Sequence, residues 1–299
     1  MKPSVFVQQQ GFACNFGGSD SWVILSPIEQ NIKRKIEATG TPLKDWDINI
    51  CRGVLTGYNE AFVISTEKRD EILSNCQTGE ERERTAELIR PILRGRDIKR
   101  YGYNWTGLWL INTHNGVKGK LPRIHIEDYP AVKAHLDQHW DKISTRTDKG
   151  DTPYNLRNCA YMEDFSRPKI LYPDIMRLPR SKERMEQYPY FALDTEKFVP
   201  EATLFMMTGN HIEQICRFLC SEIGFFVFVR FYMGPVFDNT GFRYKKEYLM
   251  KLPIPVIPEY AEPDYEKLLE KKLELSDEEK SLIYSYKNQL VSESPNSEL

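Results

Sequence analysis

The sequence lacks long apolar runs and paired cysteines. No stretch of about 18 uncharged apolar residues occurs, and the most apolar segment, 223–233, is shorter and contains Arg230, so we expect no membrane-spanning helix. Met1-Lys2-Pro3 leads into three glutamines at 8–10 rather than into an apolar core, so a secretory signal is not expected. The 6 cysteines are scattered without a Cys-x-x-Cys pair, which favours reduced thiols in a cytoplasmic protein over a disulfide framework.

Signatures of common catalytic and cofactor sites are also missing. The sequence contains no Gly-x-Ser-x-Gly, no Gly-x-Gly-x-x-Gly and no P-loop. His135 and His139 have the spacing of metal ligands, but the glutamate of a hydrolytic zinc helix is absent after the first histidine, so we interpret both as solvated helix surface. We interpret Gly116–Lys120 as a basic turn. Asp151-Thr152-Pro153-Tyr154 is also read as a turn, because amino-methyltransferases carry proline where Thr152 stands. These absences predict no catalytic residue, no metal and no bound cofactor on this chain.

The composition suits a globular protein, with 40% hydrophobic and 28% charged residues among 299. The net charge of −2 conceals an uneven distribution, because residues 259–299 hold 11 acidic residues against 5 lysines. Residues 89–124 carry a net charge of +7, with Asp97 as their single carboxylate. A local concentration of positive charge is typical of a surface that binds a polyanion.

Periodicity and capping signals predict an α+β fold, a mixed domain of short strands and interleaved helices. Ser26, Pro27 and Glu29 form a helix start, and Gly40 ends that helix. In a helix that begins at Pro130, we expect Val132, Leu136, Trp140 and Ile143 on the buried face. Strands are expected at 47–52, 61–64, 108–112 and 169–172, and an extended segment at 248–255. Further helices are expected at 66–94, where Pro91 should start a new turn, and at 212–226 and 264–290.

These elements suggest a division of the chain into four segments. Residues 1–20 form a flexible lead-in, 21–258 the main domain, 259–290 an acidic helical tail, and 291–299 a disordered end. The acidic tail could dock on the main domain, dimerise or contact another protein part, and its charge argues against a place on nucleic acid.

One segment combines positive charge with aromatic residues. Residues 89–101 hold five cations among apolar residues, and Tyr103, Trp105 and Trp109 follow. Arginine can bind phosphate or guanine with two parallel hydrogen bonds, and lysines neutralise phosphates. The alternative is a solvated charged turn in which ion pairs between Arg96 and Asp97 hold a loop. From the residues alone, both interpretations remain open.

Two segments resemble the signatures of a known family. Gly53-Val54-Leu55-Thr56-Gly57-Tyr58-Asn59-Glu60-Ala61-Phe62 and Leu93-Arg94-Gly95-Arg96-Asp97-Ile98-Lys99-Arg100-Tyr101 are similar to the TaqI-like C-terminal specificity domain of type IIG restriction–modification enzymes. Residues 167–174 and 248–255 match in the family's order, and the latter also resemble the end of a recognition domain in type I specificity subunits. The resemblance spans residues 21–258.

The resemblance implies a module that reads a short double-stranded DNA sequence in a restriction–modification system. In the fused enzymes this module follows an adenine-N6 methyltransferase domain, often with a nuclease domain, and this chain has the motifs of neither. We therefore expect the C-terminal portion of such an enzyme, not an enzyme by itself. Its partners are DNA and a methyltransferase or nuclease part, which would hold S-adenosylmethionine and Mg²⁺. Two alternatives stay open: an unrecognised S-adenosylmethionine-dependent methyltransferase or nuclease, and a protein-interaction scaffold.

The resemblance and the charge pattern together suggest DNA-binding residues. Phosphate contacts are expected from Lys99, Arg100, Lys118, Lys120 and Arg123. Base-edge or groove contacts are expected from Tyr58, Asn59, Arg94 and Arg96, and further contacts from Arg177 and Arg180 in the loop 175–190. The segment around Gly95 has a second interpretation, a structural turn capped by Asp97.

Overall fold

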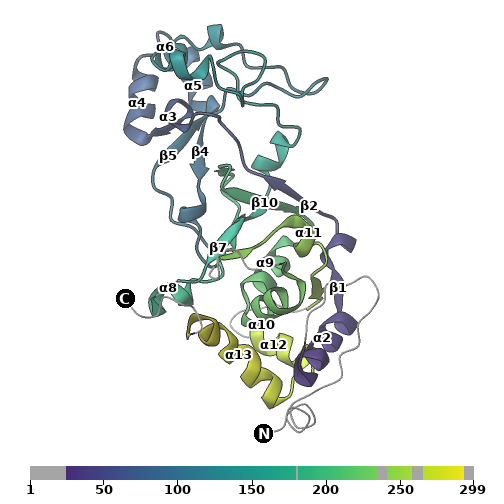
Figure 1. Ribbon diagram of the computed structural model, residues 1–299. Coiled ribbons are helices and arrows are strands. Elements are labelled where there is room, and N and C mark those ends of the chain that lie inside the picture. Colours follow the sequence, from purple (N-terminus) through teal and green to yellow (C-terminus); the bar gives the residue numbers. More distant parts are fainter. Residues whose placement is uncertain (1–24, 180, 235–240, 258–264, 293–299) are drawn as a thin grey trace. The chain divides into compact units, whose positions relative to one another are not determined.

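The computed structural model describes residues 25–179, 181–234, 241–257 and 265–292. The chain forms two compact units (Figure 1). One comprises residues 47–216, and the other combines the segment before residue 47 with the segment from residue 217 onward. The architecture is α+β, as the sequence predicts. The lead-in expected at 1–20 lies outside the described residues.

The unit of residues 47–216 contains two four-stranded sheets. The first has the strand order β2-β10-β6-β8, and all its neighbouring strands are antiparallel. Its strands are β2 (Ile48–Arg52), β10 (Leu204–Gly209), β6 (Lys169–Pro173) and β8 (Ala192–Asp194). The strands predicted at 47–52 and 169–172 are therefore confirmed.

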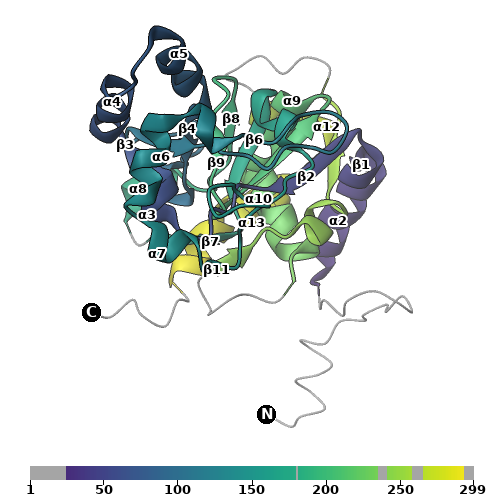
Figure 2. The same cartoon turned by 90° about the horizontal axis from the view of Figure 1, so that it is seen from above.

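The second sheet has the order β3-β5-β4-β9, in which β4 pairs antiparallel with β5 and parallel with β9. Helices α4 and α5 pack beside its strands (Figure 2), and α3 contacts both β3 and α6, which α7 contacts in turn. The elements are α3 (Asn59–Phe62), β3 (Val63–Ser65), α4 (Thr66–Ser74), α5 (Gly79–Leu88), β4 (Ile89–Leu93), β5 (Leu108–Ile111), α6 (Pro130–Asp137), α7 (Trp140–Ile143) and β9 (Val199–Pro200).

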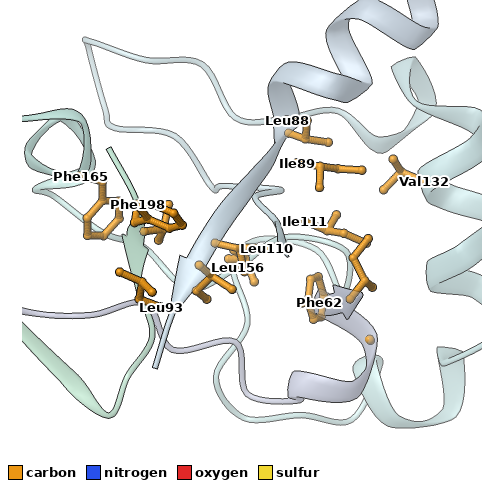
Figure 3. Packing of buried hydrophobic residues seen from close by; sticks show 14 of the residues in the cluster. Phe62, Leu88, Ile89, Leu93, Leu110, Ile111, Val132, Leu156, Phe165 and Phe198 are labelled. Atoms are coloured by element: carbon orange, nitrogen blue, oxygen red, sulfur yellow. The ribbon is translucent and has the colours of Figure 1, made fainter. Parts of the chain in front are cut away.

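An apolar core joins this second sheet to its helices. Figure 3 shows Leu88 and Ile89 near Ile111 and Val132, and each of these side chains is buried. Phe62 adds its ring from α3. Burial of such side chains is worth about 1.5–3 kcal/mol each, so the core is the main reason that these short elements hold together.

Shorter elements complete the unit. They are the 3₁₀ turns η2 (Gly95–Asp97), η3 (Ile126–Asp128) and η4 (Met162–Ser166), the strand β7 (Ile175–Arg177) and the helix α8 (Lys182–Glu186). Helix α9 (Ile212–Cys220) follows β10 and spans the boundary between the two units.

Helix α2 (Pro27–Thr39) begins the other unit as predicted. The Ser26 hydroxyl accepts a hydrogen bond from the Glu29 N–H at 3.4 Å, and the Glu29 carboxylate accepts one from the Ser26 N–H at 2.7 Å. This reciprocal arrangement satisfies two backbone donors at the helix end. The unit also contains β1 (Gly40–Pro42), η1 (Leu43–Asp45), α10 (Glu222–Val227), the π-helical segment η5 (Phe228–Tyr232), β11 (Gly241–Arg243), α11 (Lys246–Leu249), β12 (Pro253–Pro255), α12 (Tyr265–Lys272) and α13 (Asp277–Ser292).

Helices α12 and α13 of the acidic segment pack within this unit, against α10 and α2. Glu279 of α13 has a side chain only 2% exposed and pairs with Lys35 of α2 at 2.7 Å. Lys287 of α13 pairs with Glu222 of α10, also at 2.7 Å. The single helix expected at 264–290 is two helices, because Glu274 adopts a left-handed φ of 50° and Ser276 caps α13.

Four local predictions differ from the structure. Residues 59–62 form one helical turn before β3, and residues 89–93 form β4 rather than a helix with a new turn at Pro91. Residues 246–249 form a short helix, so the segment predicted as extended is a strand at 253–255 alone. Trp140 is 43% exposed rather than buried, because α6 ends at Asp137 and the break shifts the helical phase.

Candidate nucleic-acid interface

The loop between β4 and β5, residues 94–107, forms a compact structure that we call the cationic hairpin. Its sequence holds four cations and one carboxylate, Asp97. The Lys99 N–H donates to the Gly102 carbonyl at 2.7 Å, and Ile98 forms a bridge with Tyr103. The Asn104 N–H donates to the Asp97 carbonyl at 2.8 Å. These backbone hydrogen bonds are internal to the loop and help to fix its shape.

Arg94 and Asp97 stabilise the base of the cationic hairpin. Asp97, 1% exposed at its side chain, accepts from the Arg94 N–H at 2.8 Å and from its guanidinium at 3.4 Å. The guanidinium of Arg94 also donates to the Thr106 hydroxyl at 3.0 Å. The structure thus shows the capped turn of the second interpretation. The sequence-based ion pair between Arg96 and Asp97 is wrong, because Arg94 occupies that carboxylate.

Three cations of the cationic hairpin lie away from this buried pair. Arg96 is exposed and Lys99 half-buried, and no carboxylate in the described parts of the chain pairs with either. The Arg100 guanidinium lies 5.4 Å from the centre of the Tyr101 ring and donates to the Glu186 carbonyl at 3.5 Å. A polyanion could therefore bind here without displacing an ion pair of Arg96 or Lys99.

Asn59 is committed to contacts within the protein. Its side-chain oxygen accepts from the buried Thr56 hydroxyl at 2.5 Å, and its amide donates to Glu201 at 3.4 Å. Glu201 accepts from the Thr203 hydroxyl at 2.5 Å, and Thr203 accepts from the Gly95 N–H at 3.0 Å. This chain of hydrogen bonds connects the segment 53–62 to the turn at Gly95. Tyr58, expected beside Asn59 as a groove contact, donates to Glu60, and this hydrogen bond raises the pKa of its phenol.

Backbone hydrogen bonds also connect the segment 53–62 to the turn at Gly95. The Gly53 N–H donates to the Leu204 carbonyl at 2.8 Å, and the Glu201 N–H donates to the Leu93 carbonyl at 2.9 Å. A Cβ atom on Gly53 would lie 2.2 Å from the Glu201 carbonyl oxygen, so glycine is required there. The two segments with the strongest family resemblance therefore form one scaffold beneath the cationic hairpin.

A second group of cations lies on the loop after β5. Gly116 and Gly119 adopt φ values of 72° and 76°, and the Val117 N–H donates to the Leu121 carbonyl at 2.8 Å. Lys118 and Lys120 are exposed on this turn, and neither pairs with a carboxylate within the described ranges. The basic turn predicted at 116–120 is thus confirmed as a turn. The loop lines an open cavity of about 870 Å³.

The cations of the basic segment 89–124 lie mainly on two loops, one after β4 and one after β5. In the antiparallel pair of β4 and β5, Ile89 lies opposite Ile111 and Pro91 opposite Trp109. The cationic hairpin follows the last residue of β4, whereas the loop with Lys118 follows the last residue of β5. Because neighbouring antiparallel strands run in opposite directions, these two loops lie at opposite ends of the strands. The cations therefore form two separate groups.

The remaining predicted DNA contacts have different positions. Arg123, half-buried, pairs with Asp151 at 3.3 Å. Arg177 is exposed at the end of β7. Arg180 lies outside the described residues.

Arg146 holds two segments of the unit together, although the sequence analysis did not identify it. Its guanidinium, almost fully buried, donates to the carbonyl oxygens of Thr56, of Pro153 at 3.1 Å and of Asn155 at 2.6 Å. Burial lowers the pKa of Arg146 to about 10. Arg146 thereby ties the segment 53–62 to residues 151–154, which the structure confirms as a turn closed by Thr152 and Asn155. No local pattern could reveal this role, because all three acceptors are backbone groups distant from Arg146 or on a later turn.

His135 and His139 lie on either side of a helix break, because α6 ends at Asp137 and His139 directly precedes α7. His135 is buried, and its Nε2 bonds the Ala61 carbonyl at 3.0 Å, so its prediction as a solvated residue is wrong. Burial lowers the pKa of His135, which favours the neutral ring. Within the described ranges no group of three or more His, Cys, Asp or Glu side chains could hold a metal ion, and no helix there is long and apolar enough to span a membrane.

Comparison with known proteins rests on structure. No family model and no curated protein sequence matches the chain. The crystal structure of the type IIG restriction endonuclease BpuSI matches with a TM-score of 0.53 and 13% identity, over 89% of this chain and 33% of that chain. The fold resembles one part of a type IIG restriction endonuclease. The type IIL restriction–modification enzyme MmeI, solved in complex with DNA, has a TM-score of 0.48 and 13% identity over 86% of this chain and 34% of that chain. The chain thus spans about a third of the length of each enzyme.

Proposed function

We propose that this chain is a double-stranded DNA recognition module of a restriction–modification system, of the TaqI-like C-terminal specificity type. The observation that carries the proposal is the similarity of its fold to one third of a type IIG endonuclease over 89% of this chain. In this proposal the chain supplies sequence specificity. A separate adenine-specific methyltransferase and endonuclease part binds S-adenosylmethionine and Mg²⁺ and catalyses methyl transfer and DNA cleavage.

The arrangement of the cations supports this function. Arg96 and Lys99 on the cationic hairpin, and Lys118 and Lys120 on the second loop, carry charges that the described carboxylates do not neutralise. In the proposal these four residues bind phosphates, and the scaffold under the cationic hairpin fixes the positions of Arg96 and Lys99. Tyr58, Asn59 and Arg94 then act as scaffold rather than as base contacts, because their polar groups are occupied within the chain.

Selection from a randomised duplex pool, followed by sequencing, tests the proposal. We expect enrichment of one short sequence at moderate salt. Retention of no duplex at any salt concentration would refute the proposal, and heat from titration of S-adenosylmethionine into the chain would favour a methyltransferase instead.

Paired charge removal then tests the assigned residues. Arg96→Ala with Lys99→Ala should weaken binding and reduce the slope of log affinity against log salt by about 0.9 per lost phosphate contact. Lys271→Ala with Lys272→Ala removes the same charge from the acidic helix α12 and should leave the slope unchanged. Equal slopes for the first pair and the wild type would remove Arg96 and Lys99 from the interface.

A further inference from the structure

Tyr101, at the tip of the cationic hairpin, combines exposure with an unusual backbone conformation. Its side chain is 47% exposed, and its φ is 67°, in the left-handed region. Tyrosine rarely adopts this conformation because its Cβ crowds the following carbonyl, whereas glycine adopts it without strain. The backbone geometry alone therefore does not account for an aromatic residue at this position.

The backbone around Tyr101 is fixed by contacts with residues 187–192. The Tyr101 N–H donates to the Phe191 carbonyl at 2.8 Å, and the Arg100 N–H donates to the Gln187 carbonyl at 3.1 Å. Tyr101 also forms a parallel bridge with Ala192. These contacts hold the strained conformation, and strained residues that surrounding structure enforces concentrate at functional sites.

The cations around the Tyr101 ring favour a polyanionic ligand, and the ring itself favours one with stacked bases. The Arg100 guanidinium lies 5.4 Å from the ring centre, which orients the ring by a cation–π contact. Arg96 and Lys99, on the same short loop, can bind phosphates on either side of an inserted group. An exposed, rigid aromatic side chain flanked by cations matches the side chains that proteins insert between DNA base steps.

We propose that Tyr101 inserts into a groove of double-stranded DNA and partly unstacks one base step, while Arg96 and Lys99 bind the flanking phosphates. This inference rests on the proposed function and adds a way of reading sequence. Insertion favours steps that kink easily, so Tyr101 would select sequence through DNA deformability rather than through hydrogen bonds to base edges.

The test uses the full chain and an end-labelled duplex of about 30 base pairs, a length suited to measuring a bend. The duplex carries the sequence enriched by selection, or a random sequence if none is enriched. We expect wild-type protein to bind and to shorten the end-to-end distance measured by energy transfer. Tyr101→Ala should lose the bend and about tenfold in affinity, whereas Tyr101→Phe should keep both.

Two further variants separate this role from a structural one. Tyr284→Ala, which removes a tyrosine 37% exposed on α13, should keep both affinity and bend. Tyr101→Gly should lose the bend while it still unfolds cooperatively in urea, because glycine adopts the left-handed conformation of this position without strain.

The possible results are distinct. Absence of duplex binding by the wild type would refute the proposed function together with this inference. Binding with an unchanged bend and affinity in Tyr101→Ala would refute insertion alone. Tighter binding to the single strand than to the duplex would also overturn it.

Discussion

Lys169 and Asp194 form an ion pair that is completely buried. Lys169 of β6 lies opposite Asp194 of β8, both side chains are 0% exposed, and the Nζ–Oδ2 distance is 2.5 Å. The ammonium also donates to the Phe165 carbonyl at 2.8 Å, and Asp194 accepts from the Tyr103 hydroxyl at 3.2 Å. Burial lowers the pKa of Lys169, although Asp194 acts in the opposite direction.

Replacing Lys169 by Met tests the energetic consequence of this burial. The variant leaves the Asp194 carboxylate in the core without its counter-charge and leaves the Phe165 carbonyl without its donor. Breaking a buried pair from one side costs about 3–5 kcal/mol, which is a large part of a total stability of about 5–15 kcal/mol. Asp194→Leu should have a loss of similar size.

The double variant Lys169→Met/Asp194→Leu should recover most of the loss, because it buries no isolated charge. Urea unfolding followed by tryptophan fluorescence measures each variant, and Trp105, Trp109 and Trp140 all report on the unit of residues 47–216. A loss below about 1 kcal/mol in either single variant, or a double variant as unstable as the sum of both, would refute the reasoning.

Two further predictions concern stability. Gly53→Ala should lower the free energy of unfolding, measured by urea titration, by about 1–3 kcal/mol, because the new Cβ would clash with the Glu201 carbonyl. Gly79→Ala is the control. A Cβ there meets nothing within 4 Å, so this variant should be neutral or stabilising. Burial acts to raise the pKa of Glu279, but hydrogen bonds from Lys35, Ser276 and Asn31 leave that pKa below its ordinary value. The stabilisation from Glu279 is therefore present above the unfolded pKa of about 4.3 and lost as pH falls through the folded pKa. Glu279→Gln should flatten the acid limb of the thermal midpoint against pH, and an unaltered limb would contradict this.

Local signals predicted those elements whose ends are defined by nearby residues. Helix α2 carries its own capping box and an apolar face through Ile32 and Ile36, so its sequence specifies it without help from the rest of the chain. The strands β2 and β6 were likewise predicted, and for β2 the signal was the alternation of its residues.

Distant partners decided the elements that local patterns misassigned. Residues 89–93 follow a helix and contain Pro91, yet they form a strand because β5 and β9 supply hydrogen-bond partners on both sides. Tertiary pairing of this kind overrides local propensity. Trp140 is exposed because of a helix break after Asp137, and its ring lies 5.4 Å from the ring of Tyr154, 14 residues further along the chain.

The sequence by itself determined the α+β class, the concentration of positive charge and the candidate residues. The tertiary structure decided which candidates are available for binding. Arg94 and Asn59 read as DNA contacts in the sequence, but Asp97 and Glu201 engage them inside the protein. Arg96 carries the same charge as Arg94 and remains exposed. The difference is physical: a side chain's charge is a local property, whereas its available hydrogen bonds depend on what the fold brings beside it.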